Sequence, residues 1–175
     1  MGRIHKNSCR RQGDLFVKKK LIGLTVILVL LLLIGCNGSK TEEKLEVVID
    51  VDAFLQRIEE ADLFVDVLGS TRDSVLSQVM FLSTDNIESA SLFMGTAFTG
   101  EAYGVFKCTS PEAASVIVDE LKTFVEDQKD IYISYAPDAI PHFDSAIIKQ
   151  KGSYVVYVVA HENVEANKIV EEFFN

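Results

Sequence analysis

The run Tyr154–Ala160 reads Tyr-Val-Val-Tyr-Val-Val-Ala, and it restricts the possible folds more than any other stretch of the chain. Successive residues of a strand point to opposite faces of a sheet, so a strand that is apolar at every position is buried on both faces. We therefore expect 154–160 to be a central strand. Phe143–Gln150 reads as its partner, and Lys151-Gly152 predicts the hairpin turn between them.

A second hairpin and three amphipathic helices account for most of the remaining chain after residue 50. Apolar residues recur at helical spacing in the predicted helices. Because the strands come in adjacent hairpins, we expect a mostly antiparallel sheet with the helices packed on it, an α+β fold. The expected elements are strands 91–98 and 101–108 joined at Thr99-Gly100, and helices at about 52–67, 111–129 and 162–174.

Two local features leave alternatives open. Residues 74–82 are apolar and predict either a short helix or a strand. The helix near residue 111 has two possible starts: Thr109 caps it with Glu112 reaching back, or Ser110 caps it with Pro111 at the first position.

The least regular segment is 131–141, which contains two tyrosines and two prolines. Residues before proline favour extended geometry, so we expect an ordered loop here. Long irregular loops often carry binding residues. The candidate ligand loop has Tyr132, Tyr135, Pro137 and Asp138.

The N-terminal region has the pattern of a bacterial lipoprotein signal. Lys18–Lys20 precede 15 uncharged residues, which end in Leu33-Ile34-Gly35-Cys36. Fifteen residues span roughly 22 Å as a helix, less than the ~30 Å hydrocarbon core, which favours a cleaved signal over a membrane-spanning helix. We expect cleavage between Gly35 and Cys36, and a diacylglycerol on the Cys36 thiol, with further acylation such as palmitate on the new amino group.

The signal predicts three parts in the chain. Residues 1–35 are the signal peptide, 36–50 the lipidated cysteine and a tether, and 51–175 a single α+β domain. Residues 1–16 carry charges that a signal does not need, so we expect translation to start at Val17. The expected location is the outer face of the cell membrane, held by lipid.

The charge of the expected mature chain excludes nucleic acid as a partner. The first 35 residues contain seven of the 17 Lys and Arg residues and one of the 26 Asp and Glu residues. The remainder therefore has 10 basic and 25 acidic residues, a net charge of −15. A strongly acidic domain repels a phosphate backbone.

Two histidines suggest a metal site. If Lys151 and Gly152 form the turn, Gln150 pairs with Ser153 and His142 lies opposite His161. Directly opposed residues are close enough for two imidazoles to share a cation, and Asp144 on the same face would add a carboxylate. The alternative is that both histidines are ordinary polar residues at the open end of the hairpin.

No established catalytic or cofactor motif occurs in the sequence. There is no glycine-rich phosphate loop, no Gly-x-Ser-x-Gly and no paired-cysteine motif, and Cys108 has the pattern of a buried apolar residue. We therefore expect no catalytic residue and no cofactor. The preferred interpretation is a binding or structural module that contacts an envelope protein or a small molecule. The alternative is a metal-dependent envelope hydrolase that uses His142 and His161.

Several short segments, in this order, resemble a family of small Gram-positive lipoproteins known as domain of unknown function 4358. The resemblance extends from about Ala53 to Phe174. It implies an envelope location and carries no known activity. The segments are Phe106-Lys107, Gln128-Lys129-Asp130, Tyr135-Ala136-Pro137, Ala146-Ile147-Ile148 and Lys151-Gly152-Ser153-Tyr154-Val155.

Overall fold

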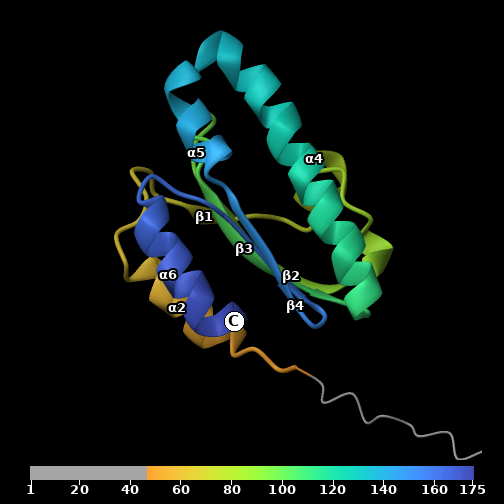
Figure 1. Cartoon of the computed structure of the whole chain (residues 1–175). Helices are drawn as coiled ribbons and strands as arrows, with labels where there is room; N and C mark the ends of the chain where they lie inside the picture. The colour runs from red at the N-terminus through yellow and green to blue at the C-terminus, as the bar shows by residue number, and fades with distance from the viewer. Residues whose placement is uncertain (1–46) are drawn as a thin grey trace, which may run out of the picture. The chain divides into compact units, whose positions relative to one another are not determined.

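The computed structural model describes residues 47–175, which fold around one antiparallel sheet of five strands (Figure 1). The strand order is β1-β2-β3-β5-β4, and every neighbouring pair is antiparallel. The expected α+β class is confirmed. The strands are β1 Gly69–Ser70, β2 Ile87–Met94, β3 Ala102–Cys108, β4 Ile147–Lys151 and β5 Tyr154–Val159. The helices are α2 Val51–Glu59, α3 Ser74–Gln78, α4 Pro111–Tyr135, α5 Ile140–Asp144 and α6 Asn163–Phe174, with single 3₁₀ turns η1 Thr84–Asn86 and η2 Pro137–Ala139.

The sheet is covered on both faces, with α4 along one face and α2 beside α6 along the other (Figure 1). Strand β5 lies between β3 and β4, as its apolar sequence predicted. Val155 and Tyr157 pack under α4, whereas Tyr154 and Val156 pack under α2 and α6. The period of two along the strand therefore supplies two separate hydrophobic cores.

Helix α2 is shorter than expected, because it ends at Glu59 and not near residue 67. Asp62 has a φ of 51°, which a right-handed helix does not accommodate. The N–H groups of Val65 and Asp66 then donate to the side chain of Glu101 rather than to helix carbonyls. The apolar spacing therefore continues beyond Glu59 without forming a helix, because a contact with a residue distant in the sequence replaces the helical hydrogen bonds.

Helix α4 is longer than expected and removes most of the predicted loop at 131–141. Its start is the second alternative, since the Ser110 hydroxyl accepts a hydrogen bond from the Ala113 N–H. The helix continues to Tyr135 because Tyr132 falls three turns after Leu121 on the same buried face. The prolines 137 and 141 lie in the first turns of η2 and α5, where proline is favoured, so this segment is helical.

Both hairpins form, but their turns and registers differ from those predicted. β2 ends at Met94, which pairs with Ala102, so residues 95–101 form a loop in place of a tight turn at Thr99-Gly100. In the second hairpin Lys151 pairs with Tyr154, and the turn is Gly152-Ser153. Gly152 has a φ of 59°, which glycine adopts without a steric penalty, and this requirement places it at the turn.

The segment 74–82 begins with the helix α3, which resolves the choice between helix and strand. No helix within residues 47–175 has the length and apolar character needed to cross a membrane. The expected signal, its cleavage site at Cys36 and most of the tether lie outside the described residues.

Candidate functional site

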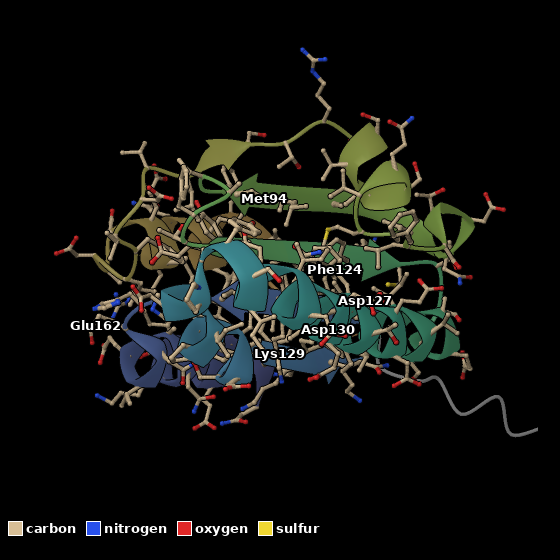
Figure 2. All side chains as sticks on the ribbon, turned by 90° about the horizontal axis from the view of Figure 1, so that it is seen from above. Met94, Phe124, Asp127, Lys129, Asp130 and Glu162 are labelled. Atoms are coloured by element: carbon tan, nitrogen blue, oxygen red, sulfur yellow. The ribbon has the colours of Figure 1, made fainter. Side chains whose placement is uncertain are left out.

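A cavity of about 330 Å³ lies between α3, the end of β2, the 95–101 loop, α4 and β5. We name it the tyrosine pocket. Met94 at the end of β2 and Phe124 on α4, both labelled in Figure 2, belong to its lining. The aromatic lining consists of Phe124, Tyr132, Tyr135, Phe143 and Tyr157.

Helical and strand periodicity bring these rings together. Phe124, Gln128 and Tyr132 follow one another at intervals of four along α4, so they share the face of the helix that points to the sheet. Tyr157 reaches the same space from the α4-facing side of β5. Phe143 on α5 completes the wall, with its ring centroid 4.8 Å from that of Tyr132.

Tyr157 is the most unusual residue of the pocket. It is 1% exposed, and its hydroxyl has no hydrogen-bond partner among residues 47–175. Burial, and then the nearby Tyr132, raise the pKa of Tyr157, so the hydroxyl keeps its proton. This hydroxyl does not belong to the fully buried unpaired polar atoms of residues 47–175, so it reaches the space of the pocket, where it is a donor available to a bound molecule.

Two further tyrosines lie at the C-terminal end of α4. The Tyr135 hydroxyl donates to the Ala97 carbonyl at 2.8 Å, which ties the helix to the 95–101 loop. Burial, followed by the side-chain hydrogen bond with Tyr135, raises the pKa of Tyr132. The rings of Tyr132 and Tyr135 have centroids 4.8 Å apart. The pocket therefore combines a ring-lined wall with several neutral hydroxyls.

Two carboxylates fix the loop that forms one wall. Glu101 is 1% exposed and accepts the N–H groups of Val65, at 3.0 Å, and Asp66, at 2.8 Å. Asp66 in turn accepts the N–H of Thr96 at 2.8 Å and the hydroxyls of Thr96 and Thr99, each at 2.6 Å. The Thr96 hydroxyl is the main cause of a lowered pKa for Asp66. These hydrogen bonds hold the 95–101 loop in a single conformation.

The electrostatics of the pocket favour a neutral ligand. None of its lining residues is Lys, Arg or His. The carboxylate in the lining, that of Glu101, is occupied by backbone N–H groups. A phosphate or carboxylate ligand would therefore find no positive partner, whereas a neutral molecule with an acceptor can bond to Tyr157.

The structure divides the predicted ligand residues. Tyr132 and Tyr135 line the tyrosine pocket, but they do so from a helix and not from a loop. Pro137 and Asp138 lie in η2 and do not line it. Phe124, Phe143 and Tyr157 also line the pocket and were not predicted as site residues. A signal for Tyr157 existed, because a tyrosine within an all-apolar strand places a hydroxyl in the core.

The predicted metal ligands are brought together only in part. His161 Nδ1 lies 3.3 Å from His142 Nε2, although His142 belongs to α5 and not to a strand. Asp144 forms an ion pair with Lys129 at 2.9 Å. Within residues 47–175 no three His, Cys, Asp or Glu side chains form a group that could hold a metal ion.

The buried Nδ1 of His142 has no hydrogen-bond partner in the described part of the chain. A neutral His142 that donates from Nε2 to His161 leaves a lone pair at Nδ1. If a metal occupied Nε2, the proton would have to lie on the buried Nδ1, where its N–H would have no acceptor. An unpaired buried N–H costs more free energy than an unpaired lone pair. The present surroundings therefore favour a hydrogen bond between the two rings.

The fold and the pocket define an α+β domain with an aromatic-lined cavity between its sheet and helix α4. The family model described as Domain of unknown function (DUF4358) matches residues 73–160, half of the chain, and the chain belongs to this family. The match covers less than the resemblance from about 53 to 174, yet it contains every residue that lines the tyrosine pocket. No curated protein and no solved structure matches the chain.

Proposed function

We propose that this protein is a binding module of the cell envelope, anchored to the outer face of the cell membrane through lipid on Cys36. Its site is the tyrosine pocket, and its ligand is a small, neutral, largely apolar molecule that carries a hydrogen-bond acceptor. The observation that carries the proposal is the hydroxyl of the buried residue Tyr157, which lines the pocket and has no hydrogen-bond partner among residues 47–175.

The size and the lining of the pocket support this class of ligand. A volume of about 330 Å³ falls in the range typical of small-molecule sites, which are mostly apolar with a few polar groups that fix orientation. Aromatic walls favour a flat ring through stacking. Among ligands with a flat ring, the hydroxyl donor of Tyr157 then favours those that carry a hydrogen-bond acceptor.

The sequence supports the anchoring part of the proposal. The lysines 18–20, the apolar run and the Gly35-Cys36 junction are the pattern of a lipoprotein signal. Residues 36–50 would serve as the tether for a single domain from residue 51. The tyrosine pocket would then face the extracytoplasmic space, where an envelope protein could also deliver or receive the ligand.

The ligand class can be tested with two probes of nearly equal shape, acetophenone and ethylbenzene. Acetophenone has a carbonyl acceptor and ethylbenzene has none. We expect Tyr157→Phe to weaken acetophenone binding to the purified full-length chain about 2- to 12-fold, the effect of one hydrogen bond, and to leave ethylbenzene binding unchanged. Calorimetric titration with each probe measures both values.

Tyr154→Phe is the matched control, because Tyr154 lies in the same strand but faces the other core. Tyr154→Phe should change neither the affinity for acetophenone nor the affinity for ethylbenzene. Equal losses in the two variants, or no saturable binding of either probe to the wild type, would contradict the proposal.

The alternative is a metal-dependent hydrolase, and the contact between the two histidines is the observation in its favour. Two nitrogens bound to one tetrahedral zinc lie about 3.3 Å apart, close to the measured separation of 3.3 Å. Thermal unfolding with and without zinc decides the question. A shift that His142→Ala abolishes would support the metal site, and the absence of any shift would end that alternative.

A further inference from the structure

A second cavity, of about 240 Å³, lies where the segment 59–68 crosses β2 and β3. We name it the carboxylate pocket. Phe93 and Tyr103 in its lining pack with the α2 and α6 core, so it lies on the face of the sheet opposite the tyrosine pocket. Three of its lining residues are acidic: Glu59, Asp62 and Asp66.

Two of these carboxylates have no bonding partner among residues 47–175. Glu59 and Asp62 are exposed, and neither forms a hydrogen bond or an ion pair with another residue in 47–175. Asp66 is bound to Thr96 and Thr99. No basic residue lines the cavity. Its potential is therefore negative, which concentrates cations.

The floor of the pocket supplies a second and independent feature. Tyr103 is 4% exposed, and its ring is stacked between Phe64, at 5.3 Å, and Phe93, at 4.8 Å. Its hydroxyl has no hydrogen-bond partner in the described part of the chain. Burial, and then the charge of Glu59, raise the pKa of Tyr103. Tyr103 is thus a buried residue whose hydroxyl has no partner among residues 47–175 and lies in the field of the exposed Glu59 carboxylate.

These features fit an organic cation better than a metal ion. The carboxylates do not converge as a three-ligand metal group within residues 47–175. Leu63, Val67 and Leu68 add apolar surface next to the charges. An ammonium group with an apolar substituent would satisfy both kinds of wall.

We propose that the carboxylate pocket binds a small organic ammonium ion. The ammonium group would lie between Glu59 and Asp62 and donate hydrogen bonds to their carboxylates, while the Tyr103 hydroxyl would contact a polar atom of the ligand. The apolar part would pack against Leu68 and the ring of Phe64.

The test compares three probes of similar size: butylammonium, 1-butanol and butyrate. Amide NMR spectra of the ¹⁵N-labelled full-length chain show where each probe binds. We expect butylammonium to shift amide signals of residues 59–68 in a saturable manner that weakens with salt, and the other two probes to leave them unchanged. Butanol acting as strongly as butylammonium would overturn the proposal.

Variants then test the role of the charges. The double variant Glu59→Gln and Asp62→Asn should weaken butylammonium binding at least tenfold, and asparagine tolerates the positive φ at position 62. Glu60→Gln is the control, because Glu60 is exposed on the same helix end but does not line the pocket. An equal loss in the control would also overturn the proposal.

The two proposed sites can fail separately. Tyr157→Phe should leave butylammonium binding unchanged, since Tyr157 lies on the other face of the sheet. The double carboxylate variant should likewise leave acetophenone binding unchanged.

Discussion

The carboxylate of Asp66 accepts both the N–H and the hydroxyl of Thr96, at 2.8 and 2.6 Å. Asp66 lines the carboxylate pocket and Thr96 lines the tyrosine pocket. One cluster of hydrogen bonds therefore forms part of the wall between two cavities on opposite faces of the sheet. The stability of both sites depends on the same loop contacts.

Replacing Asp66 by Asn should make part of the stability independent of pH. The hydroxyl of Thr96 lowers the folded-state pKa of Asp66 below its ordinary value of 3.8. A lowered pKa stabilises the fold at pH values above the unfolded pKa, and this stabilisation is lost as the pH falls through the folded value. We expect Asp66→Asn to cost about 1 kcal/mol at pH 7 and nothing in strong acid.

Urea unfolding of the wild type and the variant at a series of pH values measures this difference. Asp62→Asn is the control, because its side chain has no partner among residues 47–175 and should change stability little at any pH. A difference between wild type and Asp66→Asn that does not vary with pH would contradict the role of the charge.

Glu101→Gln should destabilise the fold by about 2 kcal/mol, because an amide group replaces one oxygen that accepts a backbone N–H. Glu101 is buried and holds the N–H groups of Val65 and Asp66. Chemical denaturation gives the change in the free energy of unfolding. The exposed Glu60→Gln should lie within about 0.5 kcal/mol of the wild type, and equal effects of the two changes would show that the buried hydrogen bonds contribute little.

The same contacts show which parts of the structure a sequence can predict. The buried strand β5 and the start of α4 depend on local periodicity and capping, so the sequence predicted the strand and offered Ser110 as one of two possible helix starts. The end of α2 depends on Glu101, more than 30 residues away, which no local pattern encodes. Long-range side-chain bonds of this kind also hold the 95–101 loop in place of the predicted tight turn.

The candidate sites also depend partly on local sequence patterns and partly on long-range contacts. Tyr132 and Tyr135 were selected from the sequence, but a loop was expected where helical spacing continued. His142 and His161 are in contact, but not through the predicted strand pairing. The observed pairing in the hairpin differs from the predicted register by two residues, and His142 belongs to α5 and not to a strand. The tyrosine pocket requires α3, β2, α4, α5, β5 and the 95–101 loop at once, and their relative positions depend on packing of the whole sheet.

Gly100→Ala should destabilise the protein by about 2–4 kcal/mol and reduce binding in the tyrosine pocket. Gly100 has a φ of 67°, and an added Cβ would overlap the ring of Phe143, which lines the same pocket. Gly69→Ala is the matched control, because nothing lies within 4 Å of its added Cβ. Thermal unfolding and acetophenone titration measure the two effects, and similar melting temperatures for both variants would contradict the proposed overlap.

Cys108 should resist alkylation in the folded protein. It is 2% exposed, and burial raises the pKa of its thiol to about 11, so the reactive thiolate is about one part in a thousand at pH 8. Iodoacetamide treatment followed by mass spectrometry of the Cys108 peptide should show modification only in denaturant. Rapid modification of the native chain would contradict a role as a buried apolar residue.

Cys36→Ala should remove both lipid labelling and membrane attachment. The thiol at position 36 is the expected site of the diacylglycerol, and buried acyl chains contribute about 0.8 kcal/mol for each CH₂ group, so two chains anchor a protein stably. Cells grown with radiolabelled palmitate and then fractionated measure both properties. Cys108→Ala should keep the label and the membrane fraction, because this thiol is buried in the domain. A Cys36→Ala protein that still carries palmitate would refute the anchor, whereas a soluble and unlabelled protein that still binds acetophenone would show that the pocket works without it.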